Sequence, residues 1–308
     1  MTRYATIDVG SNTVLLLVAE RRTDGTFVPV VERAEITRLG RGVDRTGRLD
    51  AKAIADTVAV IARYAAEARA LEAAGIACVA TSAARDAANS SAFFDAARAQ
   101  AGLVPEVVSG DEEARLVWTS AWRDFGSPGR SLAVLDVGGG STELVVGDGP
   151  LPRARESAQL GAVRLTERVV TADPIPPAEL AALRAAAREG ARVLPVAAVG
   201  DPRRATLVGV AGTVTTLAAV ERGLCVYDAG VVHGATLARD RLEALFARLG
   251  AMTTAERAAV PGMEPKRADV IVAGCAIVLE AMAASGFDEL TVSDRGVRWG
   301  LLHDRFGH

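Results

Sequence analysis

The chain has 308 residues, which is too long for one ordinary core and predicts two domains. Its residues are 50% hydrophobic and 24% charged, which excludes a disordered or collagen-like protein. The formal net charge of −3 excludes the overall basic field of a nucleic-acid-binding protein, so an anionic ligand must be recognised locally. No apolar run approaches the ~20 residues of a membrane span. These features predict a cytoplasmic protein without a nucleic-acid or membrane partner.

The first part of the chain alternates strand and helix patterns. Apolar runs at 4–9 and 14–19 flank Gly10-Ser11-Asn12 and predict a β-hairpin. Helical spacing after Asp50 predicts a long helix at 51–73. Further strands are expected at 27–34, 76–80 and 104–109, and further helices at 82–89, 92–101 and 111–122. The turn-rich residues 126–129 mark the predicted domain boundary.

After that boundary the opening pattern returns. A strand at 131–137 and a strand at 142–147 flank another glycine turn, and Asp-Val-Gly-Gly-Gly-Ser-Thr at Asp136 is similar to Asp-Val-Gly-Ser-Asn-Thr at Asp8. A helix at 177–194, a strand, turn and helix at 205–220, and a strand at 290–293 follow. The similar halves predict two α/β lobes, residues 1–126 and 127–308, with a cleft between them.

Each of the twinned loops has the composition of a phosphate-binding turn. Glycines let backbone N–H groups approach an anion, and hydroxyls can add donors. The residues with these features are Gly10, Ser11, Thr13, Gly138, Gly139, Gly140, Ser141 and Thr142. Asp8 and Asp136 would repel phosphate, so we expect them to hold a bridging cation or to orient water. A plain hairpin turn explains one such loop equally well, but two copies favour a phosphate clamp.

Three adjacent acids, Asp111, Glu112 and Glu113, open the helix expected at 111–122. Ser109 followed by Glu112 fits a capping box, which gives Glu112 a structural role. Glu113 lies about 100° further round the helix, and a carboxylate there could accept a proton from an attacking water as a general base. The alternative is an ordinary acid in a first helical turn, where the helix dipole favours it.

Two other strand–helix junctions are candidates for anion binding. Arg85 lies in the first turn of its helix, where the helix dipole disfavours a cation, and a bound anion would explain it; pairing with Asp86 or Asp111 is the alternative. Gly212 and Thr213 begin a helix whose free N–H groups could bind phosphate. The GxxxxGK[ST] pattern is missing there, which excludes a Walker-type loop.

Together these segments resemble the exopolyphosphatase/guanosine-pentaphosphate phosphohydrolase (Ppx/GppA) family of the actin, hexokinase and Hsp70-like superfamily. The most specific segment is Ser109-Gly110-Asp111-Glu112-Glu113-Ala114-Arg115-Leu116. The other segments are Ile7–Thr13, Ala80–Asn89, Asp136–Glu143 and Gly209–Thr213. The resemblance implies two actin-like (ribonuclease H-like) lobes, the short form of the family without a helical HD-type extension.

The resemblance also implies a function and roles for these residues. The expected reaction is release of orthophosphate from the ends of polyphosphate with Mg²⁺. Glu113 is similar in position to the family's catalytic base, and Arg85 to its phosphate-binding arginine. Asp136 and Glu143 resemble the acids near metal and water, and Asn12 falls in a phosphate loop.

Other readings remain open. Guanosine pentaphosphate could be the substrate, since no base-recognition pattern excludes it. A phosphotransferase of the same superfamily would need an acceptor pocket, and a non-catalytic phosphate or nucleotide sensor would bind without turnover. The apolar helix pattern at 269–284 favours burial within the second lobe over a homodimer interface.

Overall fold

The computed structural model describes residues 2–308 and divides into two compact units. Unit 1 comprises residues 2–120 and Val297–His308, and unit 2 comprises Ala121–Gly296. Helix α5 (Gly110–Phe125) carries the chain from unit 1 into unit 2. This division differs from the predicted one, in which 297–308 ended the second lobe. The reason is that helix α13 (Val297–Phe306) packs on strands β1 and β2.

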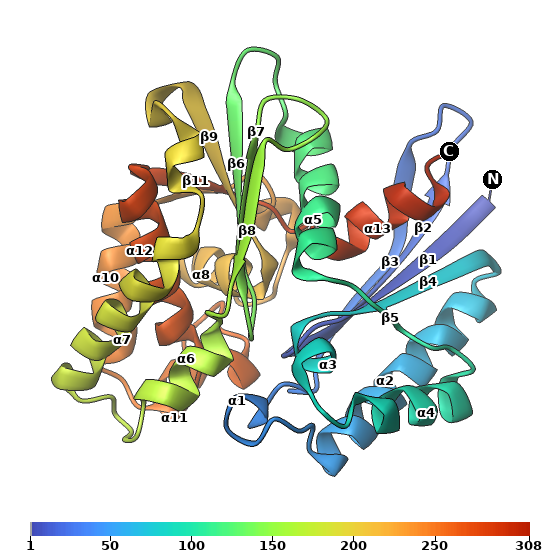
Figure 1. Ribbon diagram of the computed structural model, residues 1–308, viewed down its shortest axis with the longest axis horizontal. Coiled ribbons are helices and arrows are strands. Elements are labelled where there is room, and N and C mark those ends of the chain that lie inside the picture. Colours follow the sequence, from blue (N-terminus) through green and yellow to red (C-terminus); the bar gives the residue numbers. More distant parts are fainter. Residues whose placement is uncertain (1) are drawn as a thin grey trace. The chain divides into compact units, whose positions relative to one another are not determined.

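Unit 1 is built on a five-stranded sheet in the order β3-β2-β1-β4-β5. The bounds are β1 Thr2–Val9, β2 Thr13–Arg21, β3 Phe27–Ile36, β4 Ala73–Ala80 and β5 Glu106–Val107. The first three strands pair antiparallel, and β4 pairs parallel with β1. The helices are α1 Val43–Thr46, α2 Ala51–Ala70, α3 Ser82–Asp86 and α4 Ser90–Ala101. The hairpin predicted around Gly10 is therefore confirmed (Figure 1).

Both faces of this sheet are covered. On β2, Leu16 belongs to the core cluster that includes residues of α2 and α4. Its neighbour Leu17 faces the other way and packs with Trp299 and Leu302 of α13. Successive residues of a strand point to opposite faces, so a strand buried on both sides needs a continuous apolar run. The sequence Thr-Val-Leu-Leu-Leu-Val-Ala of β2 has that character.

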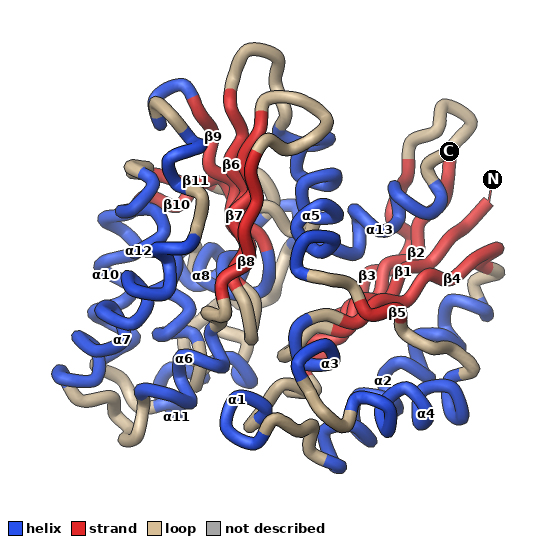
Figure 2. The backbone as a smooth tube through the Cα atoms, viewed as in Figure 1, coloured by secondary structure: helices blue, strands red, loops and turns tan. Residues whose placement is uncertain are grey.

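Unit 2 repeats the arrangement with a six-stranded sheet in the order β10-β11-β9-β6-β7-β8. The bounds are β6 Ser131–Val137, β7 Thr142–Gly147, β8 Ala154–Ala158, β9 Ala205–Val210, β10 Thr236–Ala238 and β11 Glu289–Val292. Strands β8-β7-β6 pair antiparallel and β9 pairs parallel with β6. Each unit thus has three antiparallel strands followed by a parallel one, which agrees with the similarity of the two halves in sequence (Figure 2).

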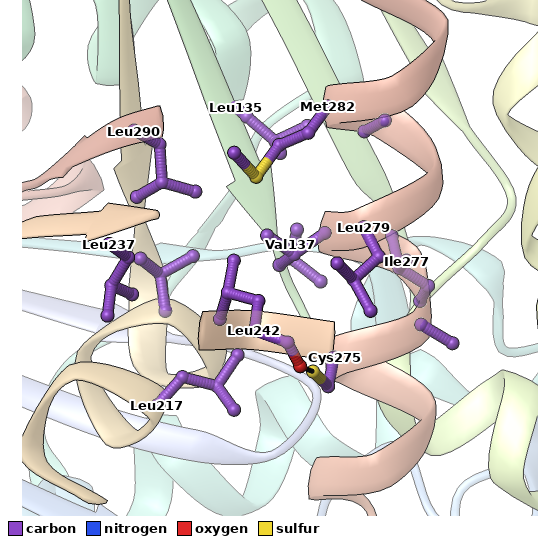
Figure 3. Close-up of a cluster of buried hydrophobic side chains, with 14 of the residues drawn as sticks. Leu135, Val137, Leu217, Leu237, Leu242, Cys275, Ile277, Leu279, Met282 and Leu290 are labelled. Carbon is purple, nitrogen blue, oxygen red and sulfur yellow. Dashed lines mark hydrogen bonds between the residues drawn. The ribbon is translucent and has the colours of Figure 1, made fainter. Parts of the chain in front are cut away.

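Helix α12 (Ile271–Ser285) lies in the core of unit 2. Its Cys275, Ile277, Leu279 and Met282 pack among side chains of the sheet and the neighbouring helices (Figure 3). The other helices of the unit are α6 Ala162–Val169, α7 Pro177–Gly190, α8 Ala211–Glu221, α9 Ala229–Val232, α10 Arg239–Gly250 and α11 Thr254–Ala258, with short 3₁₀ turns at Ala191–Val193, Val196–Val199, Pro202–Arg204 and Pro265–Arg267. Burial of α12 within its own unit confirms the expectation for 269–284.

Strand β8 and helix α6 are elements that the sequence patterns did not predict. Strand β8 is an edge strand with the sequence Ala-Arg-Glu-Ser-Ala, and most of it is only partly buried. An edge strand can carry charged residues because one side of it faces solvent, so the strand lacks the apolar alternation used for prediction. Within residues 2–308, no helix combines the length and apolar character needed to cross a bilayer.

Candidate active site

The glycine loop of unit 1 joins β1 to β2. The Gly10 N–H donates to the Thr13 carbonyl at 3.0 Å and closes the turn. The Ser11 carbonyl accepts from the Gly40 N–H at 2.7 Å, and the Asn12 carbonyl accepts from two further amides of the segment after β3. The segment after β3 therefore holds the loop through hydrogen bonds to the Ser11 and Asn12 carbonyl groups.

The glycine loop of unit 2 closes in the same way. The Gly138 N–H donates to the Ser141 carbonyl at 3.0 Å. Asp136 is the penultimate residue of β6, as Asp8 is of β1. The two sequences therefore form the same turn in each unit. That these loops face one another across a cleft stays a prediction.

Two side chains of the unit 1 loop hold buried polar atoms without a partner. Asp8 and Asn12 are each 7% exposed. Within residues 2–308, the Asp8 Oδ1 atom and the Asn12 Nδ2 atom make no hydrogen bond. A buried polar group that lacks a partner costs free energy. An acceptor and a donor left open in one turn are consistent with a site for a cation and an anion.

Burial raises the pKa of the Asp8 carboxyl to about 7, and the charge of Arg298 opposes that rise. Arg298 extends from α13, and its guanidinium donates to the Glu32 carboxylate at 2.6 Å. The Arg298 carbonyl accepts from the Thr6 hydroxyl at 2.9 Å. Helix α13 therefore brings a cation close to the end of β1.

We predict that Asp8→Asn stabilises the protein more at pH 8 than at pH 5 in metal-free buffer. Wild-type Asp8 ionises near pH 3.8 when unfolded and near 7 when folded. The folded state thus binds the extra proton, and this group's contribution to stability falls as pH rises through that window. The stability gain of the variant should grow by up to about 1.4 kcal/mol per pH unit there. Urea unfolding at both pH values measures it, and a pH-independent difference would contradict the prediction.

Glu113 and Arg85 meet in unit 1. Glu113 is 8% exposed in the first turn of α5. The Arg85 Nη1 atom lies 3.4 Å from its Oε2 atom and 2.9 Å from the Val108 carbonyl oxygen. Arg85 also lies 3.7 Å from Asp86, as the alternative reading allowed. The Arg85 guanidinium therefore lies against the carboxylate that the sequence predicts as the general base.

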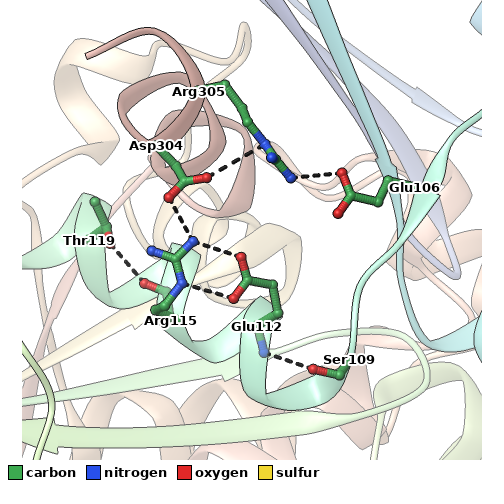
Figure 4. Close-up of polar contacts among 7 residues, drawn as sticks. All are labelled: Glu106, Ser109, Glu112, Arg115, Thr119, Asp304 and Arg305. Atoms are coloured by element: carbon green, nitrogen blue, oxygen red, sulfur yellow. Dashed lines mark hydrogen bonds and ion pairs between the residues drawn. The ribbon is translucent and has the colours of Figure 1, made fainter. Parts of the chain in front are cut away.

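The capping box predicted for Ser109 and Glu112 is only half formed. The Glu112 N–H donates to the Ser109 hydroxyl at 3.1 Å, as expected. The Glu112 carboxylate instead accepts two hydrogen bonds from the Arg115 guanidinium, which also donates to Asp304 of α13 (Figure 4). A forked guanidinium suits a carboxylate better than a single backbone donor does. Glu112 therefore has a structural role, and Glu113 is the buried acid of the pair.

Asp136 and Glu143 form an acidic pair in unit 2. They are direct partners in the register of β6 and β7, so their side chains share one face of the sheet. Both are buried, and the Ser157 hydroxyl donates to the Glu143 Oε1 atom at 2.6 Å. In unit 1 the residue opposite Asp8 is Leu15. The acidic pair is thus a difference between two otherwise similar turns.

Several predicted phosphate donors have other contacts in the structure. The Thr142 hydroxyl is completely buried and donates to the Leu160 carbonyl at 2.5 Å. The Ser11 hydroxyl accepts from the Ala83 N–H at 3.2 Å. The side chain of Thr213 is buried against Gly274. These contacts favour structural roles for Thr142 and Thr213 over direct phosphate binding.

Gly212 carries a neighbour that the sequence did not indicate. A Cβ atom at Gly212 would lie 2.1 Å from the Arg267 guanidinium, so a larger residue there would displace the end of the Arg267 side chain. Burial lowers the pKa of Arg267 to about 10. The preceding residue, Ala211, has φ 68°, a conformation that costs a non-glycine residue free energy. Arg267 lies 55 positions along the chain, and no local pattern links it to Gly212.

The acids present suit a magnesium ion. Within residues 2–308, no group of three or more His, Cys, Asp and Glu residues is arranged to hold a metal. Magnesium keeps most of its waters and needs only one or two protein carboxylates. In unit 2 the paired carboxyl groups of Asp136 and Glu143 have the chemistry that this requires, and in unit 1 the unbonded Oδ1 atom of Asp8 does. Each unit thus has its own candidate ligands, and Mg²⁺ binding stays a prediction.

The fold and the residues define a class of enzyme: an α/β phosphatase with two actin-like units. A family model described as the Ppx/GppA phosphatase family matches residues 17–307. Exopolyphosphatase 2 of Mycobacterium tuberculosis is 39% identical over 98% of each chain. The crystal structure of the Aquifex aeolicus Ppx/GppA family member has 34% identity and a TM-score of 0.80 over 98% of this chain and 97% of that one. A Cytophaga hutchinsonii exopolyphosphatase structure, 23% identical with a TM-score of 0.89 over 98% of this chain and 97% of that one, supports the fold.

The chain belongs to the Ppx/GppA phosphatase family. It is an enzyme, a phosphoanhydride hydrolase, as the resemblance of its motifs implied.

Proposed function

We propose that this enzyme releases orthophosphate from the end of inorganic polyphosphate. The observation that carries the proposal is the buried Glu113 beside Arg85, in a unit whose glycine loop leaves Asp8 and Asn12 atoms unbonded. The relatives named exopolyphosphatase, at 39% and 30% identity over nearly the whole chain, support the same substrate.

In the proposed reaction, Glu113 removes a proton from a water molecule as its oxygen attacks the terminal phosphorus atom. The bond from that phosphorus to the bridging oxygen breaks, and the bridging oxygen remains on the shortened chain. The proton passes from Glu113 to solvent. Positioning and electrostatic stabilisation supply most of the rate in phosphoryl transfer, so the main task of the protein is to hold the phosphate and the water.

Arg85 and the loop amides are proposed to bind the phosphate oxygens. The Arg85 guanidinium is anchored by the Val108 carbonyl and can exchange Glu113 for a phosphate oxygen within reach of the base. Bound Mg²⁺ would offset the charge of the phosphates and strengthen electrostatic stabilisation of the transition state. The candidate ligands are Asp136 and Glu143 in unit 2, and Asp8 in unit 1.

Phosphate release from polyphosphates of defined length tests the proposal. We expect release with Mg²⁺ and loss of release when EDTA is added. Guanosine pentaphosphate is the alternative substrate for comparison, and we expect kcat/KM to be higher for polyphosphate than for guanosine pentaphosphate. A higher kcat/KM for guanosine pentaphosphate would contradict the substrate assignment. Transfer of labelled phosphate to an acceptor, or binding without turnover, would contradict the reaction.

A further inference from the structure

Helix α6 contacts the unit 2 glycine loop through three consecutive carbonyl groups. The Ala162 N–H donates to the Gly138 carbonyl at 2.9 Å. The Gly139 carbonyl accepts from the Val163 N–H at 2.9 Å and from the Arg164 N–H at 3.2 Å. The Arg164 Nε–H donates to the Gly140 carbonyl at 2.7 Å. The N–H groups of the first turn of α6, which have no acceptor within the helix, thus donate to the loop carbonyls.

These contacts determine where the loop amides point. In a trans peptide the N–H lies opposite the C=O. Since the carbonyls of residues 138–140 point toward α6, the N–H groups of Gly139, Gly140 and Ser141 point away from it. Within residues 2–308 these three amides donate no hydrogen bond. Successive N–H groups of this kind form a concave site for an anion.

Arg164 also alters the last of these amides electrostatically. Its guanidinium binds the carbonyl of the peptide whose N–H belongs to Ser141. Hydrogen bonds to an ionised group are stronger than neutral ones, and a bonded carbonyl polarises its own peptide, which makes the N–H a better donor. Arg164 is therefore placed to make the Ser141 N–H a stronger hydrogen-bond donor without contacting that N–H itself.

Gly161 allows this contact to form. A Cβ atom there would lie 2.3 Å from the Gly139 carbonyl oxygen and 2.5 Å from the Gly140 carbonyl carbon. The backbone of Gly161 is extended, with φ −138°, so alanine would be allowed by conformation and excluded only by the loop. Any side chain at this position pushes against the loop backbone itself.

Unit 1 shows a similar arrangement with different residues. A Cβ atom at Gly40 would lie 2.8 Å from the Ser11 Cβ atom, and the Gly40 N–H bonds the Ser11 carbonyl. The Asn12 carbonyl, like that of Gly139, accepts two backbone N–H groups. A glycine packed behind the turn and amide donors to its carbonyls therefore recur in both units. The carbonyl that accepts two amides is the third of the turn in unit 1 and the second in unit 2, so the support is similar but not identical.

We propose that Arg164 and Gly161 are positioning residues for phosphate binding, which turn the amides of Gly139, Gly140 and Ser141 toward the substrate. The inference rests on the proposed function for its substrate, polyphosphate. Neither residue needs to touch the phosphate.

Steady-state kinetics of Arg164→Met tests the proposal, with Arg164→Lys as the conservative variant and Arg168→Met as the control. Arg168 is an exposed residue in the last turn of the same helix. Loss of a charge-assisted hydrogen bond is expected to raise KM for polyphosphate about tenfold or more. Arg164→Lys should recover part of that loss, and Arg168→Met should keep the wild-type KM. A merely structural role would lower the active fraction and leave KM unchanged, and that result would overturn the proposal.

Gly161→Ala provides an independent variant, with Gly149→Ala as its control. A Cβ atom at Gly149 would have no atom within 4 Å. We expect Gly161→Ala to raise KM about tenfold or more, since it displaces the loop backbone, and Gly149→Ala to leave it unchanged. A wild-type KM for Gly161→Ala would overturn the assignment of Gly161.

Hydrogen–deuterium exchange without substrate separates this inference from the proposed function. The Ala162 and Val163 N–H groups donate to the loop carbonyls, so the peptide that contains them should exchange faster in Arg164→Met and Gly161→Ala than in the wild type and both controls, because these hydrogen bonds are weakened. This result does not require that the wild type hydrolyse polyphosphate. If the wild-type protein neither bound nor hydrolysed polyphosphate, the proposed function would be wrong. The exchange result would still show whether Arg164 and Gly161 hold the loop in place. Unchanged exchange in both variants would overturn the inference.

Discussion

Replacing Glu113 with glutamine lowers kcat for phosphate release by about 10²–10⁴-fold, the usual contribution of a general base. Glutamine keeps the size of the side chain and an oxygen that Arg85 can bind, so the fold and the substrate site should persist. KM should change little, because the lost group acts on water and not on the bound phosphates. Phosphate release measured under saturating polyphosphate checks the result, with thermal unfolding as the check on folding.

The matched control is Glu112→Gln in the same helical turn. Glu112 bonds Arg115 on a partly exposed surface, so this variant should lose no more than about 1 kcal/mol of stability and keep its activity. If Glu113→Gln retained activity within about threefold of the wild type, far less than a general base contributes, the assignment of the base would be wrong. Equal losses in both variants would indicate a disturbed helix instead.

Replacing Gly300 with alanine destabilises the protein by about 3 kcal/mol, the upper range for overpacking a core. A Cβ atom there would lie 1.9 Å from the Leu116 carbonyl oxygen of α5, so α5 and α13 must separate. Such a loss should lower the melting temperature by roughly 5 °C. Calorimetric unfolding measures it directly.

Gly296→Ala is the control for that variant. It lies one residue before α13, and a Cβ atom there would have no atom within 4 Å. Its melting temperature should match the wild type. An unchanged melting temperature for Gly300→Ala would contradict the close approach of α5 and α13. Gly300→Ala should also disturb the environment of Asp8, because Arg298 of α13 contributes a positive charge near the Asp8 carboxyl.

Most of the strands and helices follow from local patterns. Strand β7 has the predicted bounds, and strand β6 does as well, because apolar runs between glycine turns leave little freedom. The long helix predicted at 51–73 ends at Ala70 in the structure. Strand β4 already begins at Ala73, the last residue of the predicted helix. Pairing of this strand with β1 competes there with helix propensity. Boundaries of this kind depend on neighbours that a local pattern does not contain.

The candidate site was predicted in part. The twinned turns and Glu113 carry local signals: glycines after a strand, and an acid beyond a capping position. Arg85 was singled out as a cation in the first turn of a helix at 82–89, but α3 ends at Asp86 and Arg85 lies in its last turn, so that argument from the helix dipole was wrong. Arg164 does lie in the first turn of α6, but that helix was not predicted. Phosphate binding by the site residues and the ligands of Mg²⁺ stay predictions.

By itself, the amino-acid sequence determined the α/β class and the repeated Asp-x-Gly turns, and it singled out Glu113 as a candidate. These depend on residues within about one turn or strand of each other, where backbone preferences and hydrophobic periodicity act. Only the tertiary structure showed that α13 returns to unit 1, where the Thr6 hydroxyl bonds Arg298 across 292 positions. It also showed that Gly161 and Arg164 lie behind the unit 2 loop. Such contacts depend on which surfaces pack together, and packing joins residues that are far apart along the chain.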